Sequence, residues 1–250
     1  MVAMDILTFF TPTEIMGLDG KANVIVVFDV LRGSTTIVAA FKAGATRIIP
    51  VVDLDQAVRL AFKLGREDVL LCGERNGEPI EGFDMGNSPL EYTPDKVEGK
   101  TLIFSSSNCS KAILASRNAK RILIGCFNNI QAIMESIEQP STIYLLCAAK
   151  MGRFSFEDAV CAGMFIHIFM ESYSGEIGLN DASSTSRYLY RQHHRDILGM
   201  LKQSSHGNFL TKLGRQQDLE YAALVNSETI VPELSLDKNY IIPTVAIKQL

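Results

Sequence analysis

Short apolar segments alternate with helical patterns along most of the chain, and this alternation constrains the fold more than any other feature. The first cycle is NVIVVFDV, residues 23–30, followed by STTIVAAFKA, residues 34–43. Further strands are predicted at residues 47–52, 69–73, 101–105, 121–126 and 142–147, and further helices at residues 55–64, 107–116, 129–137 and 155–170. Strands that are apolar throughout and flanked by helices are typical of a sheet covered on both faces. The predicted fold class is α/β, a three-layer α/β/α arrangement with a largely parallel or mixed sheet.

The last part of the chain has a mainly helical pattern. Residues 184–214 are polar and helical with a break near residues 204–207, and residues 217–225 form a short helix. Residues 229–231 and 241–247 are predicted as closing strands. No low-complexity linker divides the 250 residues. We therefore predict one domain over residues 1–250 with a helical C-terminal part, or two closely packed lobes, since a single core stops growing at about 250–300 residues.

The charge and cysteine content exclude several classes of protein. A net charge of −4 provides no general positive field for nucleic acid. The five cysteines are an odd number without C-x-x-C spacing, so neither a disulfide framework nor a zinc knuckle is expected. The N-terminus has no basic leader region, and the longest apolar run is shorter than the roughly 20 residues of a membrane span. We expect a cytoplasmic protein without nucleic-acid or membrane partners.

Polar residues follow three of the predicted strands, in the sequences FDVLRGSTT, IFSSSNCS and LLCAAKMGRFSFED. Ligands of open parallel sheets bind outside the carboxyl ends of the strands. The helix after each turn adds free backbone N–H groups and a partial positive charge at its start. Three such turns on neighbouring strands would form one anion-binding site, to which the second turn contributes Ser107 and Asn108. No P-loop, nucleophile elbow, HExxH motif or dinucleotide-binding fingerprint indicates another class.

The first turn offers groups for a phosphate and for a cation. Arg32 has a guanidinium suited to bidentate phosphate contact, and Ser34 and Thr35 have hydroxyl groups. Ser34 is equally well explained as a helix cap, which contributes about 1 kcal/mol. Asp29 ends an apolar strand, where a carboxylate is costly unless it is paired or bound to a cation. It is either the ion-pair partner of Arg32 or a Mg²⁺ ligand.

The third turn has two pairs of alternative interpretations. Ser155 and Asp158 fit a helix capping box, whereas Glu157 or Asp158 facing the strand ends would suit Mg²⁺, which binds oxygen ligands. The same turn has C-x5-R spacing from Cys147 to Arg153, as in phosphatases with a thiolate nucleophile. Cys147 also continues an apolar strand, where a buried inert thiol is commoner.

Residues 73–92, GERNGEPIEGFDMGNSPLEY, form a long polar loop. Loops of this length in compact domains are usually functional or disordered. Glu74, Arg75 and Asp84 are its charged candidates, and its scattered apolar residues favour an ordered loop that closes over a substrate.

Taken together, the segments FDVLRGSTTI, CGERNGEPIEGFDMGNSP, SSSNCSKAI and CAAKMGRFSFEDAVCAG resemble the 2-phosphosulfolactate phosphatases, as does the later HGNFLTKLGRQQDLEYAA. The resemblance runs from residue 24 to about residue 231. It implies an α/β/α fold with a mixed sheet, Mg²⁺ as cofactor, a role in coenzyme M biosynthesis, and hydrolysis of 2-phosphosulfolactate to 3-sulfolactate and phosphate. By motif position it implies that the site contains Asp29, Arg32, Ser34, Thr35, Glu74, Arg75, Asp84, Asn87, Gly152, Ser155, Glu157 and Asp158.

Two residues depart from the pattern of these phosphatases. Cys109 stands where the second turn usually has glycine, and Ala149 stands where glycine usually follows Cys-Ala in the third turn. Glycine is the residue that tolerates an unusual φ, so both departures are expected to alter the pocket.

We predict metal-assisted attack of water on phosphorus, with Arg32 and the turn amides stabilising charge on the phosphoryl oxygens and Arg75 binding a second acidic group. The predicted catalytic residues are Asp29, Arg32 and Glu157; the predicted metal ligands are Asp29, Asp84, Glu157 and Asp158; and the predicted substrate-binding residues are Ser34, Thr35, Arg75, Asn87, Ser107, Asn108, Gly152 and Ser155. The expected partner is a small anionic phosphate ester, and a homodimer is an alternative to a monomer. Two other functions stay open, a non-catalytic anion-binding protein on the same scaffold and a cysteine-dependent phosphatase that uses Cys147.

Overall fold

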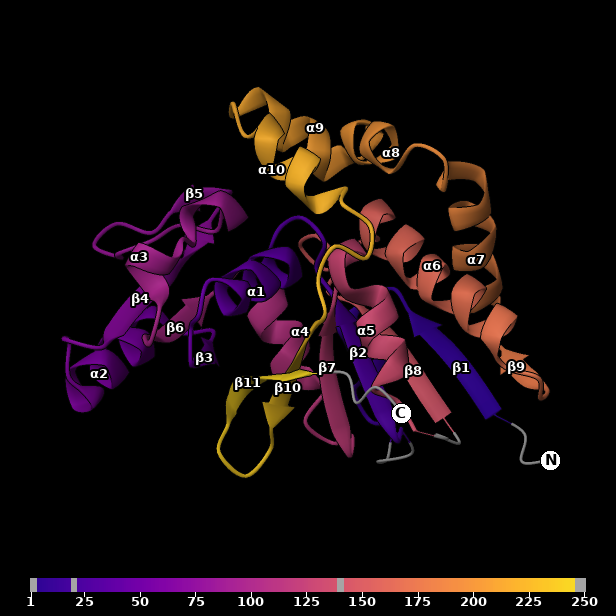
Figure 1. Cartoon of the computed structure of the whole chain (residues 1–250), viewed down its shortest axis with the longest axis horizontal. Coiled ribbons are helices and arrows are strands. Elements are labelled where there is room, and N and C mark those ends of the chain that lie inside the picture. Colours follow the sequence, from indigo (N-terminus) through magenta and orange to yellow (C-terminus); the bar gives the residue numbers. More distant parts are fainter. Residues whose placement is uncertain (1–3, 19–21, 139–141, 246–250) are drawn as a thin grey trace.

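The computed structural model describes residues 4–18, 22–138 and 142–245. Eleven strands in these residues form one sheet, in the order β5-β4-β6-β3-β11-β10-β7-β2-β8-β1-β9 (Figure 1). The strand bounds are β1 Met4–Phe9, β2 Val24–Phe28, β3 Arg47–Val51, β4 Val69–Arg75, β5 Glu78–Pro79, β6 Thr101–Ser105, β7 Arg121–Gly125, β8 Thr142–Cys147, β9 Ile177–Leu179, β10 Ile230–Ser235 and β11 Tyr240–Val245.

The sheet consists of two parallel blocks joined by an antiparallel hairpin. One block contains β7, β2, β8, β1 and β9, and the other contains β4, β6 and β3. The hairpin of β10 and β11 joins them through one paired position on each side, Glu233 with Leu123 of β7 and Ile241 with Ile48 of β3. This arrangement confirms the predicted largely parallel, mixed α/β sheet.

Helices cover the sheet on both faces and complete a three-layer α/β/α structure (Figure 1). The helix bounds are α1 Gly33–Lys42, α2 Leu54–Leu64, α3 Pro94–Val97, α4 Cys109–Ala115, α5 Ile130–Glu135, α6 Phe156–Ser172, α7 Asp181–His193, α8 Ile197–Gln203, α9 Ser205–Lys212 and α10 Gln216–Ala222, with short 3₁₀ helices η1 Pro12–Ile15, η2 Pro89–Glu91 and η3 Phe127–Asn129.

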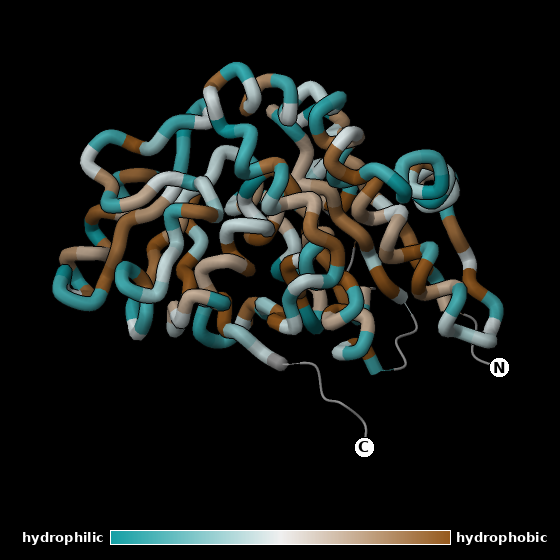
Figure 2. Tube along the Cα trace, turned by 45° about the horizontal axis from the view of Figure 1, so that its top comes forward, coloured by the Kyte–Doolittle hydropathy of each residue, from teal (hydrophilic) through white to brown (hydrophobic). Residues whose placement is uncertain are grey.

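Strand β2 shows why the strands are apolar throughout. Val24, Val26 and Phe28 belong to a core shared with α5, α6 and the C-terminal helices, whereas Ile25 and Val27 belong to a core shared with α1 and α4. Successive side chains of a strand point to opposite faces, so a sheet covered on both faces needs apolar residues at every position. Figure 2 shows the same distribution, with hydrophobic segments in the interior and hydrophilic ones on the outer turns and helices.

Helices α8, α9 and α10 lie across the upper end of the sheet in Figure 1. Two side-chain caps separate the C-terminal helices. Asp196 accepts a hydrogen bond from the Gly199 backbone N–H at 2.8 Å, and Ser204 accepts one from the Gly207 N–H at 2.9 Å. The break predicted near residues 204–207 is confirmed at Ser204, and the structure adds a second break between α7 and α8.

The sequence patterns did not identify every strand. β1 and β9 were not predicted, and they pair with each other at the edge of the sheet. Within the predicted closing strand at residues 241–247, residues 246 and 247 lie outside the described residues. No helix in the described part of the chain combines the length and the apolar character that crossing a bilayer needs.

Candidate active site

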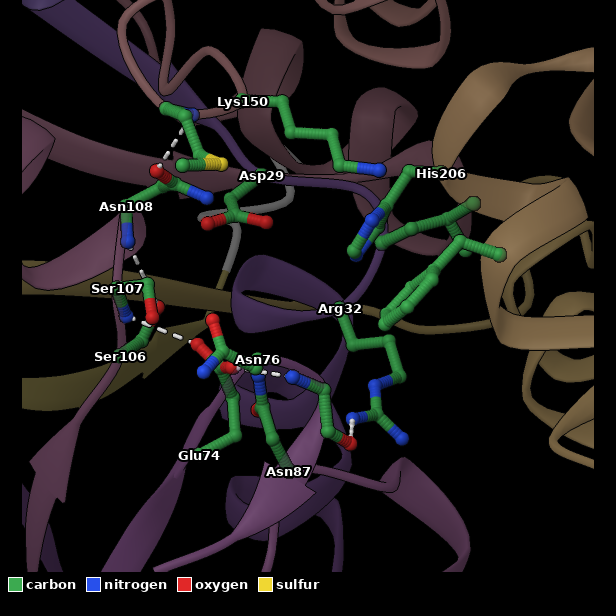
Figure 3. A pocket seen from close by; sticks show the side chains of 14 residues that line it. Asp29, Arg32, Glu74, Asn76, Asn87, Ser106, Ser107, Asn108, Lys150 and His206 are labelled. Atoms are coloured by element: carbon green, nitrogen blue, oxygen red, sulfur yellow. Dashed lines mark hydrogen bonds between the residues drawn. The ribbon is translucent and has the colours of Figure 1, made fainter. Parts of the chain in front are cut away.

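Segments far apart in the chain enclose one cavity of about 220 Å³ (Figure 3). They are the ends of β2, β4, β6 and β8, the loop that contains Asn87, and helix α9. The residues that line the cavity are Asp29, Leu31, Arg32, Glu74, Asn76, Gly77, Asn87, Ser106, Ser107, Asn108, Lys150, Met151, His206 and Phe209. The three polar turns of the sequence analysis therefore meet at one place, although their strands belong to two different blocks of the sheet.

The β2–α1 turn builds the wall around Asp29. The Gly33 backbone N–H donates a hydrogen bond to Asp29 Oδ1 at 3.3 Å. The Ser34 hydroxyl accepts a hydrogen bond from the Asp29 backbone N–H at 2.9 Å, and the Thr35 hydroxyl donates to the Val30 carbonyl at 2.8 Å. Ser34 and Thr35 are fully buried and are not among the lining residues, so their hydroxyls shape the turn and do not face the cavity.

Asp29 is a buried carboxyl in an acidic environment. Burial, chiefly, and the negative charges of Glu74 and Glu157 raise its pKa to about 7, although the Gly33 N–H partly opposes the rise. Arg32 pairs with another residue, so the ion pair considered for Asp29 and Arg32 is not formed. A buried carboxylate beside like charges is stabilised by a cation, because the cation offsets both the desolvation and the repulsion.

Glu74 and Asn87 place further oxygen atoms at the cavity. Glu74 accepts hydrogen bonds at 2.9 Å from the backbone N–H groups of Gly77 and Ser107, which connect the ends of β4 and β6. The buried Asn87 Oδ1 has no hydrogen-bond partner among the described residues. The Asn87 backbone is held by the Thr36 hydroxyl, which donates to its carbonyl at 2.8 Å. An unpartnered buried oxygen in a lined cavity is a candidate ligand atom.

The second and third turns contact each other through Asn108. Its Oδ1 accepts a hydrogen bond from the Met151 backbone N–H at 3.2 Å. This bond fixes the side-chain amide so that its nitrogen lies toward Asp29 in Figure 3. Ser107 lies beside Asn108 on the same wall. The two turns thus offer hydroxyl and amide groups to a ligand from one side.

Arg32 lines the cavity and is held from outside by the C-terminal helices. Its Nη1 lies 2.7 Å from Asp218 Oδ2 of α10, and its Nη2 donates to the Gly77 carbonyl at 2.7 Å. The Ser88 hydroxyl donates to the other Asp218 oxygen at 2.5 Å. Arg32 and Asp218 are both buried. The guanidinium is therefore fixed by residues from three separate segments.

Lys150 and helix α9 form the remaining wall. Lys150 Nζ lies 5.1 Å from the centre of the Phe209 ring, and the His206 ring stacks on Phe209 with a centroid distance of 5.8 Å. Burial, with the positive charges of Lys150 and Arg32, lowers the pKa of His206 to about 3. The imidazole is therefore neutral at physiological pH. Burial also lowers the pKa of Lys150.

Comparison with known proteins assigns the chain to a family. Residues 9–237 match the family model described as 2-phosphosulpholactate phosphatase. The chain belongs to the 2-phosphosulpholactate phosphatase family. A protein of Caldanaerobacter subterraneus subsp. tengcongensis is 35% identical over 242 residues, which cover 96% of this chain and 98% of that protein. A protein of Caldicellulosiruptor saccharolyticus is 39% identical over 224 residues, covering 87% and 91%.

A protein of Clostridium acetobutylicum is 37% identical over 214 residues, covering 85% of this chain and 90% of the relative. All three relatives are named probable 2-phosphosulfolactate phosphatase. These findings confirm the resemblance and the predicted enzyme class, a phosphoric monoester hydrolase. The family and the names of the relatives assign no role to single residues, and those roles follow from the geometry of the cavity.

Within this family member, the acidic pair of the third turn lies behind the cavity. Glu157 and Asp158 are buried but do not line the cavity. Asp158 Oδ1 accepts a hydrogen bond from the Val30 N–H at 2.9 Å, and Ser155 caps α6 by accepting one from the Asp158 N–H at 3.4 Å. The capping interpretation of Ser155 therefore fits the structure. Gly152 is exposed and also lies outside the lining residues.

Arg75 and Asp84 are used elsewhere in the fold. The Arg75 guanidinium donates to the Val52 carbonyl at 3.0 Å and to the Ser105 hydroxyl at 2.9 Å, so it fastens the end of β4. Asp84 forms an ion pair with Arg66 at 2.8 Å. Neither residue lines the cavity. The structure therefore does not bring the predicted second anion-binding residue or the predicted metal ligand Asp84 to the site.

Cys147 is unsuited to the thiolate mechanism. It is fully buried at the end of β8 and does not line the cavity. Burial, with the nearby charges of Asp158, Glu14 and Glu157, raises the pKa of its thiol well above the ordinary value. A thiol nucleophile needs access and a lowered pKa, so the cysteine-dependent alternative does not fit.

The two departures from the family pattern have different consequences. Ala149 has a φ of +66°, in the region that favours glycine. Cys109 begins α4 and is not among the positive-φ residues, so the expected φ conflict at Cys109 is wrong. Its side chain instead lies against Gly33, where an added Cβ would come within 2.5 Å of the Cys109 Cβ. Glycine at position 33 therefore makes room for Cys109 beside Asp29.

Several lining residues were missed by sequence reasoning. Lys150 stands inside the CAAKMGR turn, and His206 and Phe209 stand in the HGNF segment that carried part of the resemblance. Asp218, which holds Arg32, comes from the DLE sequence of the same region. The sequence patterns pointed to the turn or segment that contains each of these residues. No pattern identified which residues within it face the cavity.

The oxygen atoms of this site fit a hard cation such as Mg²⁺. The described residues contain no group of three or more His, Cys, Asp or Glu side chains placed to hold a metal ion. Mg²⁺, however, is commonly bound by one or two carboxylates together with water and substrate phosphate. Asp29, Glu74 and the unpartnered Oδ1 of Asn87 supply such a set in one cavity.

Proposed function

We propose that this chain hydrolyses 2-phosphosulfolactate to 3-sulfolactate and inorganic phosphate with the help of Mg²⁺. The observation that carries the proposal is the composition of one cavity. Asp29, Glu74 and Asn87 provide oxygen ligands, while Arg32 and Lys150 provide positive charge for anions. The family and the names of the relatives support the substrate. Coenzyme M biosynthesis stays a prediction from the resemblance.

The proposed cation site consists of Asp29, Glu74 and Asn87. Burial, chiefly, and the negative charges of Glu74 and Glu157 raise the pKa of Asp29, and no cationic side chain among the described residues lies within ion-pair distance of its carboxylate. When bound there, Mg²⁺ would polarise the phosphoryl group and offset the charge that develops on its oxygen atoms. This set replaces the predicted ligands Asp84, Glu157 and Asp158, which do not line the cavity.

The residues of the chain hold and orient the phosphate ester. Arg32 is fixed by Asp218 and Gly77, so its position costs no reorganisation during the reaction. Asn108 and Ser107 offer donors from the opposite wall (Figure 3). Water adds to phosphorus while the P–O bond to the sulfolactate oxygen breaks, and the leaving oxygen takes up a proton. Such positioning of the reactants supplies much of the rate enhancement in phosphoryl transfer.

Phosphate release from 2-phosphosulfolactate tests this function. We expect turnover by the purified chain with Mg²⁺, loss of turnover after EDTA, recovery after Mg²⁺ is added back, and loss of turnover in Asp29→Asn. Asp68→Asn, which changes an exposed carboxylate on another part of the surface, is the matched control. Full activity after exhaustive chelation would contradict the Mg²⁺ proposal. Tight phosphate binding without turnover of any phosphate ester would favour the non-catalytic alternative.

A further inference from the structure

The two cationic side chains that line the cavity differ in how far they are neutralised. Arg32 has a carboxylate partner, Asp218, at 2.7 Å and donates a second hydrogen bond to the Gly77 carbonyl. Lys150 forms no ion pair with any residue that the structure describes, and its ammonium lies over the Phe209 ring. A cation–π contact compensates an ammonium less than a carboxylate does. Glu157, behind the cavity, also acts on Lys150, but from beyond ion-pair distance, so Lys150 presents the larger uncompensated positive charge to a ligand.

The wall around Lys150 is built for a group that differs from the one at the acidic wall. Phe209 contributes an apolar face, and His206 contributes a ring whose buried Nδ1 has no hydrogen-bond partner among the described residues. Figure 3 shows Lys150 and His206 together, with Glu74 and Asn87 at the other end of the cavity and the Asp29 carboxylate between the two ends. A phosphate that shares a cation with Asp29 and Glu74 belongs at the acidic end. The other end is left for the rest of the substrate.

The substrate of the proposed function has a chemistry that matches this division. 2-Phosphosulfolactate carries a carboxylate and a sulfonate on a short carbon chain in addition to its phosphate. An ammonium beside a neutral imidazole and an aromatic ring is suited to one such anion and to the carbon atoms next to it. His206 stays neutral at physiological pH, because burial and the charges of Lys150 and Arg32 keep its pKa low. It therefore adds hydrogen-bonding capacity to this wall without adding charge.

We propose that Lys150, seated on Phe209 and beside His206, determines specificity by binding the second anionic group of the substrate, a carboxylate or sulfonate. This inference rests on the proposed function, because it assigns a role within the same site. Lys150 thus replaces Arg75, which the sequence predicted to bind the second acidic group. The Arg75 guanidinium instead donates hydrogen bonds to Val52 and Ser105. The consequence is a preference for phosphate esters with an acidic tail over simple alkyl phosphates.

Two substrates and two variants test the inference. The substrates are 2-phosphosulfolactate and isopropyl phosphate, which has the same branched ester but no second anion. Lys150→Met keeps the length of the side chain and removes its charge, whereas Lys150→Arg keeps the charge. For Lys150→Met we expect kcat/KM on 2-phosphosulfolactate to fall about 10- to 100-fold, the effect of one lost charge-assisted hydrogen bond. The fall should lie mainly in KM, with isopropyl phosphate changed less than about 3-fold and with partial recovery in Lys150→Arg.

The matched control is Lys212→Met, which removes an exposed lysine from the same helix as His206 and should leave both substrates unchanged. An equal fall on both substrates in Lys150→Met would overturn the inference, because it would place Lys150 at the phosphoryl group. Unchanged kinetics on both substrates would overturn it as well.

A binding measurement separates this inference from the proposed function. Calorimetric titration with 3-sulfolactate and, separately, with inorganic phosphate needs no turnover. We expect Lys150→Met to weaken the binding of 3-sulfolactate about 10-fold or more and to leave phosphate binding unchanged. If the wild-type chain hydrolyses no phosphate ester, the proposed function fails, but selective loss of 3-sulfolactate binding would still support the role of Lys150. Equal binding of 3-sulfolactate by wild type and Lys150→Met would contradict that role.

Discussion

Arg32 and Asp218 form a buried ion pair, with 2.7 Å between Nη1 and Oδ2, although 186 positions separate them in the sequence. The pair joins the β2–α1 turn to helix α10. Gly77 and Ser88 complete the arrangement by accepting from the guanidinium and donating to the carboxylate. The C-terminal helices therefore determine where the Arg32 guanidinium stands at the cavity, even though Asp218 itself does not line it.

The first prediction concerns this pair. Asp218→Ala leaves Arg32 buried without its counter-charge, so we expect the free energy of unfolding to fall by about 3–5 kcal/mol. Asp218→Asn keeps a hydrogen-bonding group of similar shape, and we expect it to lower stability less while still lowering kcat/KM on 2-phosphosulfolactate. Urea denaturation and steady-state kinetics measure the two effects.

An exposed ion pair is the control for Asp218. Asp68→Ala breaks the contact between Lys100 and Asp68, whose side chain is 81% exposed. We expect a loss of at most about 1 kcal/mol there, because solvent screens the pair. A similarly small loss in Asp218→Ala, with normal kinetics, would contradict the role given to the buried pair.

The second prediction concerns the pH dependence of stability without Mg²⁺. Burial, chiefly, with Glu74 and Glu157, raises the pKa of Asp29 from 3.8 to about 7 in the folded chain. The folded state thus holds this proton more tightly than the unfolded state. The contribution of Asp29 to stability is present below pH 3.8 and is lost as the pH rises to about 7. Each pKa unit corresponds to about 1.4 kcal/mol.

The comparison with Asp29→Asn isolates this contribution, because Glu157 and Asp158 also have raised pKa values in the folded chain. We expect the metal-free variant to gain stability relative to wild type between pH 4 and pH 7. Mg²⁺ should stabilise wild type more than the variant at pH 7.5. Parallel stability curves for the two proteins across this range would contradict the environment assigned to Asp29.

The fold was predictable where local patterns repeat. β6 and β8 have the predicted bounds, because both faces of these strands are covered and all their residues except Thr142 are buried. β9 was not predictable, since three residues carry too little periodicity. The joining of the two blocks depends on one paired position on each side of the β10–β11 hairpin. No local pattern specifies such long-range pairing.

The site was predictable as a set of turns but not residue by residue. Polar residues after apolar strands located the turns that follow β2, β6 and β8, because the end of an apolar strand tolerates polar residues only at a site or a helix cap. Ser34 and Thr35 look like ligands in sequence, yet their hydroxyls bond to the backbone of their own turn. His206 and Asp218 come from helices of the C-terminal part, whose placement follows from tertiary packing.

The third prediction concerns the cysteines. All five are buried. The raised pKa of the Cys147 thiol, caused mainly by burial, keeps it protonated at pH 8. We therefore expect native enzyme treated with iodoacetamide at pH 8 to keep its phosphatase activity, and unfolded enzyme to be alkylated at every cysteine. Peptide mass mapping and phosphate release measure both. Rapid alkylation of Cys147 in the native chain, in parallel with loss of activity, would restore the thiolate mechanism.

The fourth prediction concerns Ala149, which has a φ of +66° next to Lys150. Alanine with a positive φ destabilises the folded chain by roughly 1–2 kcal/mol, a strain that glycine does not have. Glycine also makes the unfolded chain more flexible, which offsets about 0.4–1 kcal/mol of the stability that relief of the strain would give. We expect Ala149→Gly to raise the free energy of unfolding slightly. Ala39 is equally buried at 4% exposure but lies inside α1, so Ala39→Gly should lower it by about 1 kcal/mol. In urea denaturation we expect the two variants to change the free energy of unfolding in opposite directions. Equal losses of stability in both variants would contradict the strain assigned to Ala149.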